Sequence, residues 1–376
     1  MEKDFSLLGL NTFGFDVKAR YFQELKTMDD VRELLNNPEF IACRNATVSR
    51  LPDSHSRLLV LSGGSNILFS SEFYDGFVVY PNLKGIEALE ETAETVTVRC
   101  HCGEVWKAFV DYTVAHNLYG LENLADIPGK VGAAPVQNIG AYGAEVKDTI
   151  CQVHTIDLTT GETKVFSNEE CRFSYRNSIF KELISNRTTH ALSQRDDKSS
   201  PVSTRHALYL IFAVDFVLKK HGDLKLDYGN IRNYLTANNI TNPTLQDVAA
   251  TVKAIRTEKL PEVGVVGSVG SFFQNAIVPV EKYQEIKALY LDVPSYPVDG
   301  NAVSPTMVKI PSGWLIDRAG WRGYRENHVG VWDKQALVLV HYGGGKPHEI
   351  LDLMKKIQDS VYQKFGVEIK PEVNIV

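Results

Sequence analysis

Two glycine-rich stretches carry the residue pattern most able to hold a ligand. The longer is the glycine-rich segment, residues 121–143, which reads LENLADIPGKVGAAPVQNIGAYG and is apolar although glycine and proline interrupt it. Glycine permits positive φ and close backbone approach, and proline fixes φ, so neither a long helix nor an ordinary strand fits. A surface linker would be more polar. The composition therefore favours backbone packed against a flat, bulky ligand, and the plain alternative is a buried connection between domains.

The second stretch is the turn SGGSN at Ser62–Asn66, which lies between the apolar runs LLVL and ILF. Adjacent glycines expose backbone N–H groups without side-chain obstruction, as a bound diphosphate requires, although most Gly-Gly pairs only turn the chain. No G-x-G-x-x-G fingerprint occurs, so a doubly wound dinucleotide-binding fold is not predicted. Gly343–Lys346 also fails the phosphate-loop spacing, and we interpret it as an ordinary loop.

The cysteines predict neither disulfides nor a metal centre. There are 5 of them, an odd number, and no paired C-x-x-C units occur. Cys100, His101 and Cys102 stand together, but they follow a strand-like run that places both cysteines on one face. We find no complementary cluster at metal-ligand spacing, so no metal is expected.

Composition is that of an ordinary globular protein with several domains. The chain has 376 residues, 44% of them hydrophobic and 23% charged, with a net charge of −6. This charge gives no global attraction to nucleic acid or anionic membrane. No apolar run reaches transmembrane length, and residues 1–20 lack a signal-peptide core, so we expect a cytoplasmic protein.

Several motifs resemble, in order, those of the UDP-N-acetylenolpyruvoylglucosamine reductase (MurB) family. The glycine-rich segment resembles the family's flavin-binding segment, and the remaining matches cover nearly the whole chain. They are LSGGSNILF at Leu61–Phe69, CRFSYRNSIFK at Cys171–Lys181, GSFFQN at Gly270–Asn275, SGWLID at Ser312–Asp317, QALVLV at Gln335–Val340 and PEV at Pro371–Val373. Tyr296, in a proline-flanked loop, resembles the lid of the subtype that closes over the nucleotide.

The resemblance implies an α+β fold with a two-part FAD-binding region of the vanillyl-alcohol-oxidase type and a C-terminal α/β substrate-binding domain. The first FAD-binding subdomain would span residues 1–83, joined by a C-terminal strand at 366–376. The second would span 84–260, and the substrate-binding domain 261–365. The polar stretch Asn186–His206 is expected to be an exposed, poorly ordered insertion, because it cannot bury enough apolar surface to offset its ordering entropy.

The same resemblance implies noncovalent FAD, with NADPH as hydride donor. The implied cofactor-binding residues are Gly63, Gly64, Ser65, Asn66, Ile127, Gly129, Gly132, Asn138, Ile139, Gly140, Tyr142 and Arg256.

Reduction of an enol ether beside a carboxylate needs a hydride, a proton and a group that meets the developing negative charge. The hydride comes from the cofactor. The family assigns the proton and the stabilisation of charge to an Arg, a Ser and a Glu, which fall here on Arg176, Ser271 and Glu372. Arg176 would pair with the substrate carboxylate through its planar fork. Ser271 would protonate the enolate carbon, and Glu372 would stabilise the intermediate. Outside these motifs, such residues are more often a surface ion pair, a turn serine and a solvated carboxylate.

The implied UDP-sugar site uses cations, amides and aromatic rings, which suit a diphosphate and a stacked base. Its residues are Tyr228, Lys259, Asn275, Tyr296 and Gln335. Two positions depart from the family pattern: Gln274 stands where Lys is frequent, and Asn374 where Arg is common. These departures alter inferred nucleotide or flavin contacts without removing a catalytic group.

Hydrophobic periodicity and turn residues predict the elements that position these residues. Thr244 is a candidate N-cap for a helix that carries Arg256 and Lys259 at its basic end. Predicted strands are Phe77–Tyr80, Thr95–Cys100, Leu208–Leu218, 336–340 and the closing VEIKPEVNIV with Glu372, and Ile150–Leu158 and Thr163–Phe166 form a hairpin. Predicted helices are Gly103–His116, 280–290 and Pro347–Phe365, the last of which ends at Gly366. The apolar side of the first helix carries Val105, Trp106, Phe109, Val110 and Thr113. Gly264–Gly270 is expected to be a flexible segment that leads into GSFFQN.

The function expected from these residues is conversion of UDP-N-acetylglucosamine enolpyruvate to UDP-N-acetylmuramate, in peptidoglycan precursor synthesis. The expected partners are the UDP-sugar and NADPH, without nucleic acid or membrane insertion, and we expect a monomer. Two alternatives stay open: a flavin oxidase of the same fold that acts on an alcohol or hydroxy acid, and a flavin- or UDP-sugar-binding module without turnover.

Overall fold

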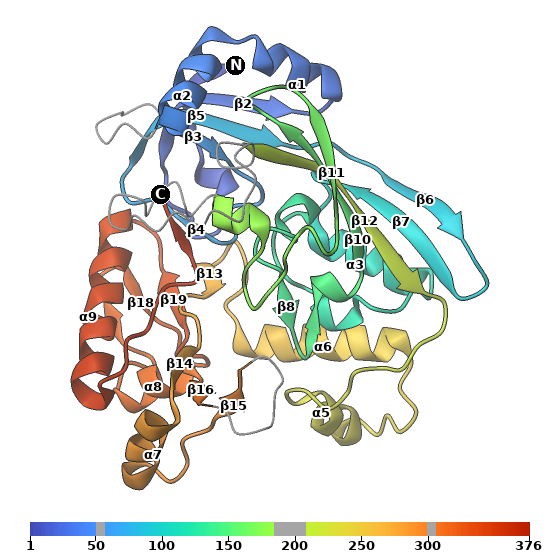
Figure 1. The fold of residues 1–376 in the computed structure, drawn as a ribbon. Helices are drawn as coiled ribbons and strands as arrows, with labels where there is room; N and C mark the ends of the chain where they lie inside the picture. The colour runs from blue at the N-terminus through green and yellow to red at the C-terminus, as the bar shows by residue number, and fades with distance from the viewer. Residues whose placement is uncertain (50–56, 184–207, 299–305) are drawn as a thin grey trace. The chain divides into compact units, whose positions relative to one another are not determined.

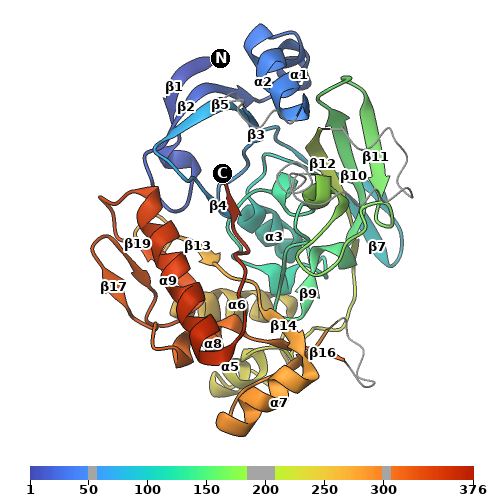
Figure 2. The ribbon, with the colours of Figure 1, turned by 60° about the vertical axis from the view of Figure 1, so that its left-hand side comes forward.

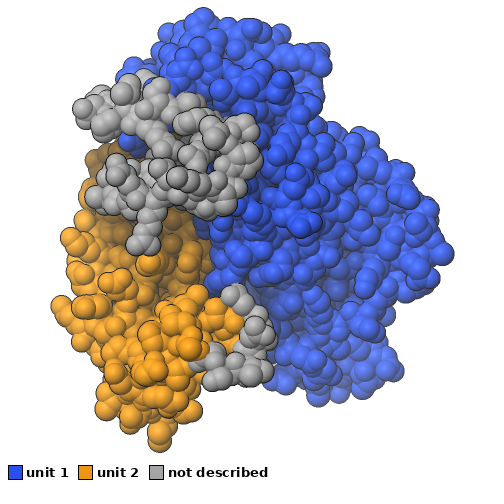
Figure 3. All heavy atoms as spheres, viewed as in Figure 1, with its two compact units in different colours: residues 1–5, 19–63, 75–256 blue, residues 6–18, 64–74, 257–376 orange. Residues whose placement is uncertain are grey.

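The chain forms two compact units in a computed structural model that describes residues 1–49, 57–183, 208–298 and 306–376 (Figure 3). Unit 1 contains Met1–Phe5, Ala19–Gly63 and Asp75–Arg256, and unit 2 contains Ser6–Lys18, Gly64–Tyr74 and Thr257–Val376. Both units are therefore discontinuous in sequence. The three-part division expected from the resemblance stays a prediction, and the insertion Asn186–His206 lies outside the described residues.

An antiparallel sheet of order β11-β10-β12-β7-β6 is the centre of unit 1 (Figure 1). The predicted hairpin is confirmed, since His154 pairs with Val165 across it. The strands are β6 (Ile86–Glu91), β7 (Thr95–His101), β10 (Ile150–Asp157), β11 (Thr163–Ser167) and β12 (Tyr209–Lys219).

Alternation along β7 and β12 gives this sheet one apolar face, which packs into a core with α3 (Trp106–Ala115) and α6 (Leu245–Lys259). Thr244 caps α6 as predicted: its hydroxyl accepts from the backbone N–H of Asp247 at 3.2 Å. The expectation for Val105 is wrong. It precedes α3 in extended conformation and is 46% exposed, because the helix begins only at Trp106.

A second sheet in unit 1, of order β1-β2-β5-β3, packs against α1 and α2, which lie together on one side of it in both ribbon views (Figure 1, Figure 2). Side chains of α1 and α2 pack with Phe77 and Val79 of β5. The elements are β1 (Glu2–Ser6), β2 (Lys18–Leu25), α1 (Met28–Leu35), α2 (Pro38–Ser49), β3 (Arg57–Val60) and β5 (Phe73–Pro81); α5 (Ile231–Ala237) follows β12.

Unit 2 combines two antiparallel sheets, of order β13-β19-β18-β17 and β14-β16-β15, with helices α7, α8 and α9. The predicted helix Pro347–Phe365 is confirmed as α9, and Gly366 ends it at φ 63°, a conformation that favours glycine. The other elements are β4 (Ile67–Leu68), β13 (Gly267–Ser271), β14 (Ala276–Pro279), α7 (Val280–Leu289), β15 (Tyr296–Pro297), β16 (Met307–Ile310), α8 (Ser312–Arg318), β17 (Arg325–Glu326), β18 (Val329–Val331), β19 (Val338–His341) and β20 (Asn374–Ile375).

Two expectations for unit 2 need correction. Residues 267–270 belong to strand β13, which pairs with β19, so only the start of the expected flexible lead lies outside regular structure. Glu372 does not lie in a strand, because β20 is shorter than predicted and begins at Asn374. Among the described helices, none is long and apolar enough to cross a membrane.

Candidate functional site

The glycine-rich segment is irregular, as predicted, and its backbone packs closely against neighbouring backbone in unit 1. It contains only short pieces of regular structure: turns of 3₁₀ helix at Glu122–Leu124 and Val131–Ala133, and β8 (Gly140–Ala141), which pairs with β9 (Ala144–Glu145). A Cβ placed on Gly63 would lie 2.7 Å from Gly129 Cα. The two glycine-rich stretches therefore meet at Gly63, and a side chain there would separate them.

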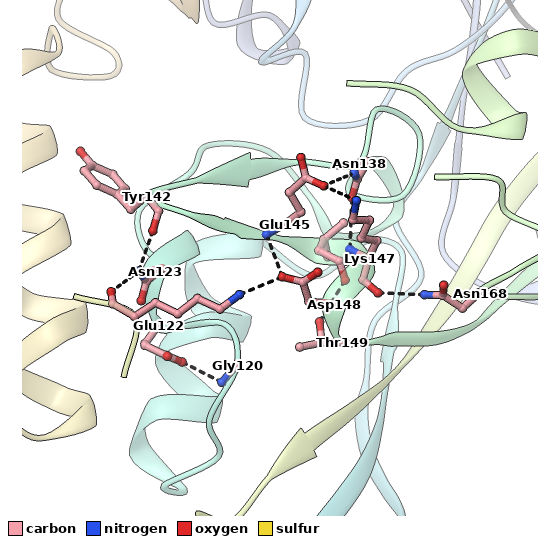
Figure 4. Close-up of polar contacts among 12 residues, drawn as sticks. Gly120, Glu122, Asn123, Asn138, Tyr142, Glu145, Lys147, Asp148, Thr149 and Asn168 are labelled. Carbon is pink, nitrogen blue, oxygen red and sulfur yellow. Dashed lines mark hydrogen bonds and ion pairs between the residues drawn. The ribbon is translucent and has the colours of Figure 1, made fainter. Parts of the chain in front are cut away.

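Asn138 holds the centre of the segment together (Figure 4). Its side chain is fully buried. The amide nitrogen donates to Glu145 Oε2 at 3.0 Å and to the Ser174 carbonyl at 3.1 Å, and the amide oxygen accepts from the Lys147 N–H at 3.1 Å. The nitrogen and the oxygen of the side-chain amide both form hydrogen bonds with protein groups. Asn138 therefore contributes to any ligand site by fixing the backbone around it.

Arg176 lies against this segment within unit 1. Ser174 and Asn177 exchange two backbone hydrogen bonds of 3.1 Å, which place Arg176 at the tip of a tight turn. The guanidinium then donates to the Gly140 carbonyl at 2.8 Å. Arg176 has φ 54° and Tyr142 has φ 48°, a left-handed conformation that is rare for bulky residues. Strain of this kind persists where the surrounding structure enforces it, and it is frequent at functional sites.

Two tyrosines and two glycines pack reciprocally at the end of the segment. A Cβ on Gly143 would lie 3.1 Å from Tyr228 Cβ, and one on Gly229 would lie 3.2 Å from the Tyr142 ring. The structure thus brings together a residue expected to bind the cofactor, Tyr142, and one expected to bind the substrate, Tyr228. The Tyr228 side chain remains exposed.

Arg256 approaches the same segment from α6. Its Nε donates to the Asp126 carbonyl at 3.1 Å. Burial lowers the pKa of the Arg256 guanidinium from its ordinary value. A desolvated cation of this kind is suited to an anionic ligand. Ile127 and Ile139 pack with their apolar side chains on the core beneath the segment.

In unit 2, the turn that contains Gly64, Ser65 and Asn66 is bonded to the residue that follows the C-terminal PEV motif. The Asn374 N–H donates to the Asn66 carbonyl at 3.1 Å, and the Asn374 side-chain amide donates to the same oxygen at 3.1 Å. Asn374, which departs from the family pattern, therefore helps to hold this turn. A Cβ on Gly64 would lie 1.9 Å from the Leu10 carbonyl oxygen, so only glycine fits there.

Ser271 and Glu372 come from distant parts of the sequence and belong to adjoining segments of unit 2. The Glu372 N–H donates to the carbonyl of Phe272, the residue after Ser271, at 2.8 Å. Ser271 is exposed at the end of β13, and Glu372 is half-buried. Ser271 and Glu372 belong to unit 2, whereas Arg176 belongs to unit 1. The geometry of these residues is therefore described within each unit separately.

Two of the expected substrate residues meet at α8. The Ser312 N–H donates to Asn275 Oδ1 at 3.2 Å, and a Cβ on Gly313 would lie 3.2 Å from Gln335 Oε1. Tyr296 pairs with Lys309 between β15 and β16 and keeps an exposed side chain, and Lys259 is half-buried at the last residue of α6. The structure places Asn275 and Gln335 at the start of α8, and no hydrogen bond or ion pair joins them to Lys259 or Tyr296 in the part of unit 2 that it describes.

Some groups at this site were not predicted from the sequence. Asn123 is buried and donates through its amide to the carbonyls of Tyr142 and Lys225, each at 2.8 Å, and its bond to Tyr142 is drawn in Figure 4. The Ser62 hydroxyl is buried without a protein partner among the described residues. An amide side chain among apolar residues was the available signal for Asn123, and a serine before the Gly-Gly pair was the signal for Ser62.

The described residues offer no metal centre. Within the described ranges, no group of His, Cys, Asp and Glu side chains could hold a metal ion. Cys100 and Cys102 are both buried, but they pack in different cores, Cys100 with α3 and α6 and Cys102 with α1 and α2, so the expected shared face is not seen. Burial raises the pKa of the Cys102 thiol to about 11. Such thiols stay protonated at neutral pH and are poor ligands and nucleophiles.

Comparison with known proteins identifies the kind of ligand. Residues 44–167 match the family model described as FAD binding domain, and residues 260–376 match the model described as UDP-N-acetylenolpyruvoylglucosamine reductase, C-terminal domain. The described residues fit FAD: no described protein acceptor takes the N–H of Gly63 or Gly64, so both donors can meet a diphosphate. The chain is therefore a flavoprotein in class.

Relatives specify the family. The chain is 37% identical to the UDP-N-acetylenolpyruvoylglucosamine reductase of Flavobacterium johnsoniae, over 100% of this chain and 99% of the relative. It is 40% identical to the reductase of that name from Bacteroides fragilis, over 100% of both chains. The chain belongs to the UDP-N-acetylenolpyruvoylglucosamine reductase family. Its fold resembles the crystal structure of the reductase (MurB) from Thermus caldophilus, with a TM-score of 0.60, 18% identity, and coverage of 99% of this chain and 97% of that one.

Proposed function

We propose that this chain is an FAD-dependent reductase that uses NADPH to convert UDP-N-acetylglucosamine enolpyruvate to UDP-N-acetylmuramate. The observation that carries the proposal is the similarity over the full length to reductases of that name, at 37–40% identity. The activity belongs to peptidoglycan precursor synthesis. The geometry of each unit supports the proposal, because hydrogen bonds fix Arg176 in unit 1 and the segments of Ser271 and Glu372 in unit 2.

FAD, when bound, would supply the hydride that it has received from NADPH. The protein must then hold the substrate carboxylate as negative charge develops on it. We assign this task to Arg176, whose planar fork suits a carboxylate and whose position is set by its bond to Gly140. A fixed donor needs no reorganisation as the charge appears, which is how electrostatic stabilisation lowers a barrier.

We assign the proton to Ser271 and the second stabilising contact to Glu372. The bond between the Phe272 carbonyl and the Glu372 N–H keeps these two segments in register, so that both side chains can serve one reacting centre. Ser271 would give its hydroxyl proton to the enolate carbon. Glu372 would hydrogen-bond the intermediate.

We assign the UDP-sugar to Tyr228, Lys259, Asn275, Tyr296 and Gln335. The cationic and amide groups suit phosphate oxygens, and exposed tyrosines provide both a stacking surface and a hydroxyl. We further propose that the enzyme acts in the cytoplasm as a monomer. Light scattering during size-exclusion chromatography tests the second statement, and a mass twice that of the chain would contradict it.

An anaerobic two-step assay tests the function. Addition of NADPH to the yellow holoenzyme should bleach the flavin absorbance, and addition of the enolpyruvyl UDP-sugar should restore it without oxygen. Reoxidation by oxygen alone, with no response to the UDP-sugar, would indicate an oxidase. A colourless protein that takes up no FAD would refute the proposal. A yellow protein that NADPH cannot bleach would indicate a flavin-binding module without turnover.

A further inference from the structure

Lys130 is a buried cation inside the glycine-rich segment and is not among the residues assigned to the cofactor, the substrate or catalysis. Its side chain is 8% exposed. The ammonium lies 3.8 Å from the centroid of the Tyr80 ring and donates to Asn82 Oδ1 at 2.8 Å. Tyr80 lies near the end of β5, and Asn82 follows that strand directly. Lys130 therefore links the glycine-rich segment to the end of β5, in the sheet of order β1-β2-β5-β3.

Asn82 also connects Lys130 to β2, through Glu24. Its amide nitrogen donates to Glu24 Oε1 at 2.5 Å, so the Asn82 amide lies between a cation and a carboxylate. An amide oriented in this way is polarised from both ends, which strengthens both hydrogen bonds. Glu24 also pairs with Lys26 at 3.1 Å. The negative charge of Glu24 is therefore shared between two lysines and reaches Lys130 only through the Asn82 amide.

The backbone beside Lys130 is the part of the segment that meets the Gly-Gly turn. The Trp106 N–H donates to the Gly129 carbonyl at 3.0 Å, and the Val131 N–H donates to the Glu104 carbonyl at 2.9 Å. Gly129 is the residue whose Cα faces Gly63. A shift of the Lys130 side chain would therefore be transmitted to the place where the two glycine-rich stretches meet.

We propose that Lys130 is a positioning residue for FAD: its ammonium, held between the Tyr80 ring and Asn82, fixes Gly129 against Gly63 and keeps the backbone donors aligned for the cofactor. This role rests on the proposed function. It requires the charged form of the side chain, because neutral lysine loses the cation–π contact and the charge-assisted hydrogen bond.

The surroundings make that charge titratable near physiological pH. Burial lowers the pKa of Lys130 to about 8, with the nearby Lys84 acting in the same direction and Cys102, Glu24 and Glu104 opposing it. FAD affinity should therefore fall as pH rises through about 8. Protein stability should move the other way. The unfolded chain keeps the ordinary lysine pKa of 10.5, so between the two values it binds more protons than the folded unit, and stability rises with pH there.

The test measures FAD dissociation by flavin fluorescence from pH 6.5 to 9.5, for the wild-type protein, Lys130→Met, Lys130→Arg and the control Lys220→Met. Lys220 pairs on the surface with Glu91, at 2.6 Å, and has no part in the site. We expect wild type and control to lose about 10- to 30-fold in affinity between pH 8 and pH 9.5, because loss of one proton from a group with a pKa of about 8 can lower affinity by no more than roughly 30-fold at pH 9.5. Lys130→Met should bind weakly at every pH. Lys130→Arg should keep its affinity past pH 8.

Two further outcomes separate this role from a merely structural one. Urea unfolding of the apoprotein should show wild type gaining stability relative to Lys130→Met between pH 8 and 9.5, while its FAD affinity falls. If Lys130→Met does not fold, wild type and Lys130→Arg still decide, because only wild type should show the step. Tight FAD binding by wild type without a step near pH 8, or the same step in Lys130→Arg, would overturn the role of Lys130 and leave the proposed function intact. Absence of FAD binding at every pH would refute both.

Discussion

Ser271 is exposed at the end of β13, where a hydroxyl can reach a ligand without disturbing the core. If it donates the proton to the enolate carbon, it acts only after the hydride has been transferred to the substrate. Ser271→Ala should then leave NADPH bleaching nearly unchanged and slow reoxidation by the UDP-sugar about 10²–10⁴-fold. Ser271→Cys should recover part of the rate, because a thiol can also donate a proton. Stopped-flow absorbance measures both half-reactions.

A serine that only shapes the turn gives a different result. Its truncation would cost on the order of 1 kcal/mol of stability and would affect both half-reactions equally or neither. Ser268, which lies earlier in the same strand, provides the matched Ser→Ala control. Equal slowing of both half-reactions in Ser271→Ala would remove this residue from the catalytic set.

Gly63 is needed for its lack of a side chain rather than for unusual backbone angles, because the clash is with Gly129 Cα. Gly63→Ala should destabilise the protein by about 1–3 kcal/mol, as overpacking does, and weaken FAD binding. Gly9→Ala is the control, since a Cβ there meets nothing within 4 Å. Urea unfolding and FAD titration provide the two measurements. If Gly63→Ala binds FAD as tightly as Gly9→Ala, the two glycine-rich stretches do not form one site.

At the scale of elements, three strands of the central sheet are joined on its second face by a charged cluster. Asp215 of β12 accepts from Arg99 Nε of β7 at 2.8 Å, and His154 Nε2 of β10 lies 2.8 Å from the same carboxylate. Burial works to raise the pKa of Asp215, but the hydrogen bonds from Arg99 and His154 hold it below its usual value.

Removal of this carboxylate charge should destabilise the sheet. Asp215→Asn should lower the free energy of unfolding by about 2–3 kcal/mol at pH 7, because hydrogen bonds between charged groups are lost while Arg99 stays partly buried. The folded pKa lies below the ordinary value of 3.8, so this contribution is present above that value and is lost as pH falls below it. Urea unfolding at pH 7 and pH 3 measures the change.

An exposed ion pair offers the control for this cluster. Asp29 pairs with Arg32 within α1, and both side chains are largely exposed, so Asp29→Asn should be nearly neutral. A difference between wild type and Asp215→Asn that persists unchanged at pH 3 would show that the cluster stabilises the sheet by packing and not by charge.

At the scale of the whole molecule, the polar stretch Asn186–His206 should be dispensable. Its composition cannot support a core, and we expect a deletion variant to fold, bind FAD and turn over like wild type. Circular dichroism, flavin content and the two-step assay measure these properties. Loss of soluble protein on deletion would show that the stretch is a packed element.

Local physical chemistry lies behind the elements that the sequence predicted well. The helix Pro347–Phe365 has proline at its start, glycine after its end and an apolar face, and Thr244 with Asp247 caps α6. The hairpin β10–β11 follows from two strand-forming runs separated by a short turn. Each of these signals acts between residues a few positions apart, so a single sequence can show it. The ordered motifs likewise indicate the flavoprotein family from the sequence alone.

Tertiary contacts decided what these local signals could not. Gly63 meets Gly129, and Phe272 meets Glu372, across separations that no periodic pattern describes. Lys130 and Asn138 belong to residue types that are usually exposed, and their burial became visible only with the partners that satisfy them. The sequence predicted which segments form helices and which are candidates for a ligand site. Only the fold determined which side chains in these segments stay exposed and which hold the backbone in place, because that depends on hydrogen bonds and burial between segments distant in sequence.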